Sequence, residues 1–369
     1  MSSALRTAYA GKRVLVTGHT GFKGSWLCEW LLSLGAEIAG FALNPRPHEI
    51  LFDQLGIGKR IAIDRRADLA DRSALAALVA DFSPDIVLHL AAQPLVRLSY
   101  EIPVETFATN VLGTVHLLEA VRLRGKPCAV VCVTTDKCYE NREWLHAYRE
   151  EDPMGGHDPY SASKGAAELV ISSYRNSFFS SGNPIRLASA RAGNVIGGGD
   201  WAQDRIVPDC IRAIRKGVSI PVRNKIATRP WQHVLEPLSG YLCLAARLSA
   251  PTNEFPLSEL CSAFNFGPAL TSNRTVAQLV DELTQHLGGR WSDASDPSAR
   301  HEASKLNLAT DKAFHLLGWQ PVWSFEETIA KTAEWYLAEA KGAASAEITR
   351  QQIDTYTSAA KEKHLPWSP

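Results

Sequence analysis

The sequence predicts an α/β protein built on a Rossmann-type, doubly wound parallel sheet, with a smaller C-terminal substrate-binding lobe. Two observations support this prediction. Short, nearly continuous apolar runs, typical of strands buried on both faces, alternate with longer segments of helical periodicity in the first half of the chain. A glycine-rich stretch, Gly18 to Gly24, lies directly between the first strand and the first helix, as in dinucleotide-binding folds.

The expected elements follow one another in a regular order. The first strand is expected at Arg13–Thr17, and apolar residues recur at helical spacing after it, from Trp26 to Leu34. Further strands are expected at Glu37–Leu43, Arg60–Asp64, Asp85–Leu90, Ala129–Thr134 and Ile185–Ala192, and helices at about Arg72–Phe82, Val104–Leu123 and Tyr160–Phe178.

The second half of the chain is less regular. After Gly197–Gly199 the alternation of strands and helices is lost, and proline and tryptophan become frequent. We expect a Rossmann domain over residues 1–192, and a mainly substrate-binding lobe over 193–345 whose strand Ala263–Phe266 returns to the main sheet. The polar tail, residues 346–369, is expected to be either loose or a packed helix.

Composition excludes several classes of protein. The chain has 369 residues, enough for a large core, and its 39 basic and 39 acidic residues cancel. Zero net charge argues against nucleic acid or an anionic membrane as the main partner. The sequence contains no run of 18 uncharged apolar residues and no apolar leader near its start, and its seven cysteines lack metal-ligand spacing. We therefore expect a cytoplasmic protein with reduced thiols and no bound metal.

The glycine stretch predicts the cofactor site. Gly18, Gly21 and Gly24 form a GxxGxxG pattern between a strand and a helix, with Phe22 and Lys23 inside it. Glycine allows a tight turn and close approach of a pyrophosphate, and the helix N-terminus offers free N–H groups to it. A GxxGxxG pattern in this context is much more specific for a dinucleotide than glycines at an ordinary turn.

The identity of the dinucleotide is less well defined. An acidic residue about 20 positions after the loop usually binds the ribose 2′-hydroxyl, and Asn44 occupies that region here. Asn44 can still bond a hydroxyl, but it lacks the charge that repels a 2′-phosphate. The nearby Arg46 is either a phosphate partner or a solvated loop residue. NAD is the expected cofactor, and NADP remains open.

The catalytic prediction rests on Tyr160 and Lys164. They form a YxxxK pair at the start of a predicted helix, where i, i+4 spacing puts both on one face. A nearby ammonium is expected to lower the pKa of the phenol from its usual value near 10. Thr135 follows the predicted strand Ala129–Thr134, and ligands of open α/β sheets bind beyond such strand ends. Its hydroxyl is expected to share the substrate oxygen with Tyr160.

These motifs resemble the extended short-chain dehydrogenases that modify nucleotide sugars. The resemblance covers nearly the whole chain, and the segments most specific to it are similar to the CDP-glucose 4,6-dehydratases in particular. They are LAAQPLVRLSY (Leu90–Tyr100), TTDKCY (Thr134–Tyr139), YRE (Tyr148–Glu150), PMGGHDPYS (Pro153–Ser161) and RAGNVIGGGDWAQDRIVPD (Arg191–Asp209). Two positions depart from the family pattern: Asn44 replaces an aspartate, and Thr134 replaces a serine.

The resemblance implies a redox-neutral dehydration. Tyr160 would take the proton of the sugar 4-hydroxyl while hydride leaves C4. Lys137 would then remove the C5 proton, and Asp136 would protonate the departing C6 oxygen before hydride returns to C6. Such an elimination needs an acid and a base whose pKa values are shifted in opposite directions, so Asp136 must be partly protonated and Lys137 partly neutral.

The resemblance also extends the site. Positions implied to line the cofactor are Asp68, Leu69, Leu90, Ala91, Ala92 and Asn110. Positions implied to bind the sugar nucleotide are Gln93, Asn194, Arg205 and Arg229, and arginine suits a diphosphate because of its bidentate geometry. The same superfamily forms dimers through paired helices, so a homodimer or homotetramer is expected.

Three other functions stay open at this stage. A nucleotide-sugar 4-epimerase would share the fold and the first step but would not need Asp136 and Lys137. A plain dehydrogenase would release reduced cofactor. A catalytically silent NAD(P)-binding regulator could lose Tyr160 or Lys164, and this sequence keeps both.

Overall fold

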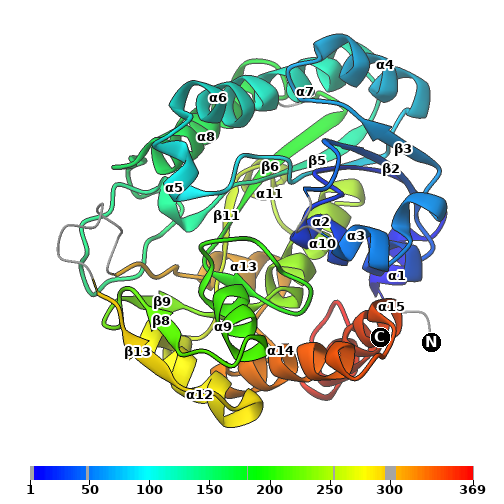
Figure 1. Ribbon diagram of the computed structural model, residues 1–369. Coiled ribbons are helices and arrows are strands. Elements are labelled where there is room, and N and C mark those ends of the chain that lie inside the picture. The colour runs from blue at the N-terminus through cyan, green and yellow to red at the C-terminus, as the bar shows by residue number, and fades with distance from the viewer. Residues whose placement is uncertain (1–3, 47–49, 181, 252–253, 296–304, 369) are drawn as a thin grey trace.

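The predicted doubly wound sheet is present. The structure, a computed structural model, describes residues 4–46, 50–180, 182–251, 254–295 and 305–368. Within these residues a seven-stranded parallel sheet has the order β11-β6-β5-β4-β1-β2-β3 (Figure 1). Its strands are β1 (Arg13–Thr17), β2 (Glu37–Ala42), β3 (Ile63–Arg66), β4 (Ile86–His89), β5 (Cys128–Val133), β6 (Ile185–Ala192) and β11 (Ala263–Phe266).

Most strand predictions are confirmed within a residue or so. The return of Ala263–Phe266 to the sheet is also confirmed, since β11 pairs with β6. The third strand is wrong by three residues, because the segment before it is still turning. Ile57–Lys59 form a 3₁₀ turn, and the guanidinium of the next residue, Arg60, donates to Glu29 Oε2 at 2.5 Å and Oε1 at 3.0 Å.

Two helical layers cover the sheet. Leucine and valine residues of α4 (Arg72–Phe82) and α7 (Gly113–Arg124) pack on one face, and α8 (Pro159–Ser177) covers the same face. The opposite face packs against α2 (Phe22–Ser33) and α10 (Leu235–Ser249). Figure 1 shows the two layers on either side of the strands. Helix α8, which carries Tyr160 and Lys164, and the glycine-loop helix α2 therefore approach the strand ends from opposite faces.

The predicted helix Val104–Leu123 is interrupted. It consists of α6 (Pro103–Phe107), a π-helical turn η2 (Ala108–Leu112) and α7. Asn110 lies in that turn, and its side chain bonds the backbone of Gln93 and the hydroxyl of Ser163. Wide turns of this kind are frequent at functional sites, where they direct a side chain out of the regular ladder.

Small elements after β6 form the region beside the strand ends. This region contains α9 (Ile206–Arg215), α12 (Val276–Leu287), α13 (Asp311–Leu317), α14 (Phe325–Ala340) and three two-stranded sheets. The sheets pair β7 (Val195–Ile196) with β10 (Gln232–His233), β9 (Thr228–Pro230) with β12 (Asn273–Thr275), and β8 (Ile220–Val222) with β13 (Trp291–Asp293).

The C-terminal tail is a packed helix, which decides between the two expectations for it. Helix α15 (Ser345–Glu362) buries Ile353 and Tyr356, and the Tyr356 hydroxyl donates to Glu236 Oε2 at 2.7 Å. Short helices α1 (Ala4–Tyr9), α3 (Leu51–Gln54), α5 (Val96–Ser99) and α11 (Leu257–Leu260) complete the fold. In the described part of the chain, no helix has both the length and the apolar character to span a membrane.

Candidate active site

The candidate site lies where the strand order reverses, between β1 and β4. In open α/β sheets ligands bind outside the carboxyl ends of the strands at this point. Gly18 follows β1 with a φ of +73°, and a Cβ there would lie 2.7 Å from the Ala91 nitrogen that follows β4. A Cβ on Gly24 would lie 2.1 Å from the Gly18 oxygen. Only glycine therefore allows the loop, the first turn of α2 and the end of β4 to meet this closely.

The N-terminus of α2 is open to a ligand. Gly21 is its N-cap and has no side chain to bond the free N–H groups, and a Cβ there would meet only the Gly18 oxygen, at 3.6 Å. The half-buried Phe22 follows it and packs against the core. Free N–H groups, the partial positive charge of the helix and unfilled space fit the pyrophosphate of a dinucleotide.

Other residues predicted for the cofactor surround this edge of the sheet. Leu90, Ala91 and Ala92 are half-buried at the end of β4, and the Thr17 hydroxyl oxygen accepts from the Ala91 nitrogen at 3.2 Å. Asn110 accepts from the Gln93 nitrogen and donates to the Ser163 hydroxyl, both at 2.8 Å. It thereby ties the segment after β4 to α8.

The residues predicted for the adenosine half lie at the ends of β2 and β3. Asn44 and Asp68 are exposed, and the Asp68 carboxylate accepts from the Ala70 nitrogen. Leu69 is buried, and its carbonyl accepts from His116 Nδ1 at 2.8 Å. Arg46 is half-buried. Contact of any of these residues with a cofactor stays a prediction.

Tyr160 and Thr135 come together at the edge of the sheet where the catalytic residues are predicted. Both side chains are buried, and a side-chain hydrogen bond joins them. Lys164 lies one turn along α8, also buried, and its Nζ donates to the Val133 carbonyl at 3.3 Å. The structure thus brings together the three residues on which the catalytic prediction rested.

The expected direction of the Tyr160 pKa is wrong. Burial raises the pKa of Tyr160 to about 12, and the groups that oppose this rise are the Thr135 hydroxyl and the Arg205 guanidinium. Lys164 is itself affected by burial, which lowers its pKa to about 8 against the opposing effect of Glu168. Removal of both groups from water outweighs the attraction on which the sequence argument relied.

Asp136 is a buried carboxyl whose pKa is raised above its usual value. It is 2% exposed, and the Thr135 hydroxyl donates to its Oδ1 at 3.0 Å. Its Oδ2 is buried without a hydrogen-bond partner. Burial raises the pKa of Asp136, although the charges of Lys137, Arg229 and Lys23 oppose the rise. Lys137, the adjacent predicted base, is half-buried.

Lys23 reaches the catalytic groups from the other side. It begins on the first turn of α2, and its ammonium lies 6.0 Å from the ring centroid of Tyr241. Burial lowers the pKa of Lys23 to about 7, with the charges of Arg205 and Lys164 acting in the same direction and Asp136 against them. This residue, predicted only from its place in the glycine loop, therefore interacts electrostatically with the residues predicted to be catalytic.

The two predicted substrate arginines approach the same groups. Arg205 donates to Asp200 Oδ2 at 2.8 Å, and its charge acts on Tyr160 and Lys23. Arg229 is buried on β9, and its charge acts on Asp136. Together they place positive charge beside the catalytic edge, as a diphosphate requires.

The structure gives less direct support for the other two residues predicted to bind substrate, Asn194 and Gln93. Asn194 is half-buried between β6 and β7, and its carbonyl accepts from the Gln232 nitrogen. The side-chain amide of Gln93 donates to the Leu95 carbonyl and to the Thr106 hydroxyl. Both N–H groups of that amide are thus used inside the chain, and its role toward substrate stays a prediction.

Sequence reasoning missed two buried residues at this site. The Tyr241 hydroxyl is fully buried without a hydrogen-bond partner; burial raises its pKa, and the nearby Tyr160 and Asp136 act in the same direction. Glu168 lies one helical turn after Lys164 and is buried with it. The i, i+4 series Tyr160, Lys164, Glu168 was a readable signal for the second residue. No signal marked Tyr241, which comes from a distant helix.

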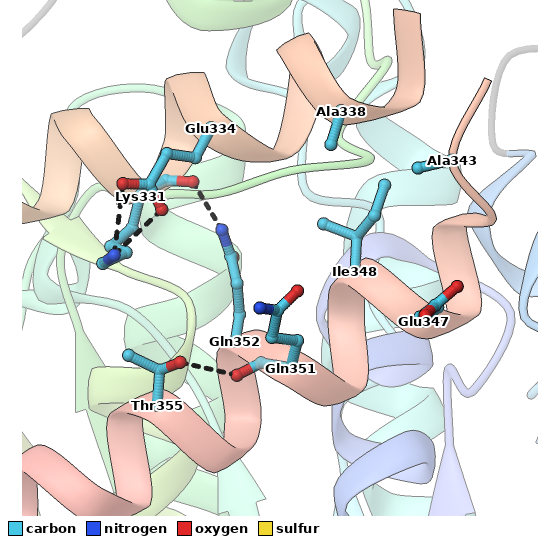
Figure 2. A pocket seen from close by; sticks show the side chains of 9 residues that line it. All are labelled: Lys331, Glu334, Ala338, Ala343, Glu347, Ile348, Gln351, Gln352 and Thr355. Atoms are coloured by element: carbon cyan, nitrogen blue, oxygen red, sulfur yellow. Dashed lines mark hydrogen bonds and ion pairs between the residues drawn. The ribbon is translucent and has the colours of Figure 1, made fainter. Parts of the chain in front are cut away.

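A separate surface pocket lies between α14 and α15. Its lining residues include Lys331, Glu334, Gln351, Gln352 and Thr355, which largely bond one another or the helix backbone (Figure 2). It contains none of the predicted site residues. No group of three or more His, Cys, Asp or Glu that could hold a metal ion occurs among the residues that the structure describes.

Fold and site together have the features of an extended short-chain dehydrogenase/reductase: the parallel sheet, the glycine loop and the buried Tyr160–Lys164 pair. The family model described as GDP-mannose 4,6 dehydratase matches residues 15–332, and the chain belongs to this family.

Individual relatives point the same way. A CDP-glucose 4,6-dehydratase of Salmonella typhimurium is 47% identical over 95% of this chain and 98% of its own length. A dTDP-glucose 4,6-dehydratase of Streptomyces antibioticus is 30% identical over 88% of this chain and 92% of its own. The solved structure of DesIV, a dTDP-glucose 4,6-dehydratase from Streptomyces venezuelae with NAD and TYD bound, superposes with a TM-score of 0.77 at 23% identity. The superposition covers 90% of this chain and 99% of DesIV.

Proposed function

We propose that this protein is an NAD-dependent CDP-glucose 4,6-dehydratase, a hydro-lyase that converts CDP-glucose to CDP-4-keto-6-deoxyglucose and water. The observation that supports a dehydratase most directly is the state of Asp136. It is a buried carboxyl with a raised pKa and one unpartnered oxygen, hydrogen-bonded to the same Thr135 that bonds Tyr160. The relative at 47% identity over nearly the whole length supports cytidine as the base.

The glycine loop would hold the cofactor. Gly18, Gly21 and Gly24 leave room for the pyrophosphate at the start of α2, and Tyr160 and Lys164 would border the nicotinamide end. NAD, when bound, supplies a hydride acceptor for C4 and a hydride donor for C6, together with a positive charge. Asn44 supports NAD through its ability to bond a ribose hydroxyl, and NADP remains the alternative that Arg46 would favour.

The first proton transfer belongs to Tyr160. The 4-hydroxyl of glucose gives its proton to the phenolate oxygen as C4 becomes a carbonyl, and the side-chain hydrogen bond with Thr135 holds the phenol oxygen in place. A tyrosine with a pKa of about 12 is almost wholly protonated at neutral pH, so little phenolate is present to accept a proton. The positive charges of Arg205 and Lys164 therefore have to assist at this step, Arg205 by favouring the phenolate directly.

The elimination belongs to Lys137 and Asp136. The 4-ketone acidifies the C5 proton, which moves to the neutral amine of Lys137. The electron pair left at C5 forms the C5–C6 double bond, and the C6–O bond breaks. Asp136 gives its proton to that oxygen, which leaves as water; hydride is then added at C6 and a proton at C5. Lys137 and Asp136 are consecutive residues, so both functions are held by one rigid turn.

The rival functions fit less well. A 4-epimerase needs no carboxylic acid near C6, and the burial of Asp136 would be a cost without a use. A silent regulator would have no use for Tyr160 and Lys164. Burial of a lysine costs free energy, and a protein without catalysis would gain nothing in return.

An assay with CDP-glucose tests the proposal. Purified protein is incubated with CDP-glucose and NAD, and the nucleotide sugars are separated and identified by mass and NMR. The expected product is the 4-keto-6-deoxy sugar, without net reduced cofactor, and dTDP-glucose under the same conditions should react much more slowly. Recovery of a C4 epimer, release of free reduced cofactor, or no reaction would each refute the assignment, and Tyr160→Phe serves as the matched inactive control.

We also propose that the protein is a cytoplasmic homo-oligomer, with a dimer as its basic unit. All seven cysteines are free thiols, which suits a reducing compartment. The segments expected to pair between subunits are Val104–Leu123 and Tyr160–Phe178. Their exposed large apolar side chains are Val104, Leu112, Leu123, Leu169 and Phe178. Sedimentation equilibrium tests this, and Leu169→Glu should weaken the dimer while leaving the free monomer folded.

A further inference from the structure

Glu168 makes an unusually complete set of buried contacts. It is 4% exposed on α8. Its Oε1 accepts from the Thr134 hydroxyl at 2.5 Å, and its Oε2 accepts from the Ser189 hydroxyl at 2.8 Å and from Arg191 Nη2 at 2.9 Å. Three elements, α8, the end of β5 and β6, therefore meet on one carboxylate. The Arg191 charge and these hydrogen bonds hold the pKa of Glu168 below its usual value despite burial.

Arg191 extends this contact to the other end of the 134–139 segment. Its Nη1 donates to the Tyr139 hydroxyl at 2.8 Å, and its guanidinium lies 4.9 Å from the centroid of the Tyr139 ring. The Tyr139 hydroxyl in turn donates to Asn265 Oδ1 on β11 at 2.7 Å. The Glu168–Arg191 pair is thus hydrogen-bonded to Thr134 at the start of the segment and to Tyr139 at its end.

The residues between those two anchors are the ones with catalytic roles. Thr135, Asp136 and Lys137 lie between Thr134 and Tyr139, and Asp136 Oδ2 remains unbonded there. A proton donor needs a segment whose two ends are fixed while one oxygen of its carboxyl, here Asp136 Oδ2, stays unbonded. Misplacement of such a donor by about 1 Å can cost about 10²-fold in rate.

The same carboxylate also acts on Lys164. Glu168 follows Lys164 by one turn of α8, and Lys164 Nζ bonds the carbonyl of Val133, the residue before Thr134. The titratable and charged groups that face Lys164 from the packed elements are Glu168 on α8, Cys132 on β5, Cys138 in η3 (Asp136–Cys138), Lys23 on α2 and His89 on β4. Among these, Glu168 has the largest effect in favour of the charged lysine.

We propose that Glu168 is a positioning residue of the active site: paired with Arg191, it fixes both ends of the 134–139 segment against α8, one helical turn from Lys164. The role of the segment rests on the proposed function. A buried ion pair can often be replaced by apolar residues without loss of stability, so stability alone does not explain its presence here. A single carboxylate that serves the proton donor segment and the lysine beside Tyr160 does explain it.

Three variants separate positioning from mere stability. Glu168→Gln keeps the shape but removes the charge, Arg191→Met removes the partner, and the double variant removes both and leaves no unpaired buried charge. Glu236→Gln is the matched control, because Glu236 is equally buried and hydrogen-bonded, by the Val322 and Trp323 nitrogens and Tyr356, but lies away from the segment. Melting temperature, kcat, KM and the pH dependence of the first hydride transfer are measured for each.

We expect the variants to change the melting temperature and kcat independently of each other. Glu168→Gln should lower kcat by about 10²-fold with KM for CDP-glucose little changed. The alkaline limb of the first hydride transfer should move down by about one pH unit, because the pKa of Lys164 falls without its carboxylate. The double variant should recover the melting temperature of the wild type but neither kcat nor the alkaline limb. Glu236→Gln should change stability alone. If the double variant recovers stability, kcat and the pH profile together, the pair is only structural and the proposal is wrong.

A readout without substrate keeps this test independent of the proposed function. Cys138 is fully buried inside the 134–139 segment, whereas Cys210 is fully buried on α9, outside it. Labelling by a thiol reagent, followed by mass spectrometry, should become about tenfold faster at Cys138 in Glu168→Gln and in the double variant, and stay unchanged at Cys210. A tenfold change corresponds to about 1.4 kcal/mol in local opening. Unchanged labelling of Cys138 overturns the proposal, whatever the wild type does with CDP-glucose; failure of the wild type on CDP-glucose alone would refute only the proposed function.

Discussion

Replacement of Asp136 by asparagine should harm catalysis and help stability. Asparagine keeps the volume and still offers an oxygen to the Thr135 hydroxyl, but it has no proton to give to the C6 oxygen. Loss of a positioned acid costs about 10²–10⁴-fold in rate. Because the C4 oxidation does not need Asp136, the variant should stop after that step, with reduced nicotinamide retained on the enzyme.

The effect on stability follows from the direction in which burial moves the pKa. Burial raises the pKa of Asp136 in the folded protein, so ionisation opposes folding. The penalty is absent at pH values below the unfolded pKa of about 3.9, grows as pH rises toward the higher folded pKa, and is complete above it. Each pH unit by which a folded pKa exceeds the unfolded pKa corresponds to about 1.4 kcal/mol of penalty. Asparagine removes this penalty, so the stability gain of the variant over the wild type should be near zero at acid pH and larger at pH 8.

Two measurements test this reasoning together. Rapid mixing with CDP-glucose, followed by near-ultraviolet absorbance, should show stable reduced nicotinamide in Asp136→Asn and only a transient signal in the wild type. Denaturant unfolding at a pH below about 3.9 and at pH 8 gives the stability difference where the penalty is absent and where it is expressed. If the variant dehydrates CDP-glucose at the wild-type rate, Asp136 is not the acid that protonates the C6 oxygen. A variant that is less stable than the wild type at pH 8 would show that the carboxylate is stabilised by its cations rather than strained by burial.

Other outcomes follow from the same site. Lys137→Ala should also retain reduced nicotinamide and should lose the exchange of solvent deuterium into C5; if it keeps both exchange and dehydration, Lys137 is not the base. Tyr160→Phe should slow the first hydride transfer by at least about 10²-fold, with NAD affinity by calorimetry little changed, and a normal turnover rate would contradict the assigned site. NAD should support a higher kcat/KM than NADP in steady-state assays; a clear preference for NADP would instead make Arg46 the partner of the 2′-phosphate.

Much of the fold could be predicted because its local signals agree with its topology. Strand β1, the glycine loop and the start of α2 are contiguous, so one short stretch of sequence contains the whole phosphate-binding turn. The YxxxK pair was also readable, since both residues lie on one helix. The π-helical turn at Asn110 was not readable, because bonds to Gln93 and Ser163, 17 and 53 residues away, stabilise it. The start of β3 was lost for a similar reason, since Arg60 leaves the strand path to reach Glu29.

The protonation states of the site show most clearly what sequence cannot give. An adjacent aspartate and lysine, Asp136 and Lys137, suggest an ordinary ion pair on a loop. In the fold, burial acts on the ionisable groups near the strand ends and drives each toward its neutral form. It raises the pKa of Asp136 and lowers that of Lys23 to about 7 and that of Lys164 to about 8. A lysine whose pKa approaches neutrality can give or take a proton near pH 7. The same burial raises the pKa of Tyr160, which the charge of Arg205 opposes, and lowers that of Lys164, which the charge of Glu168 opposes.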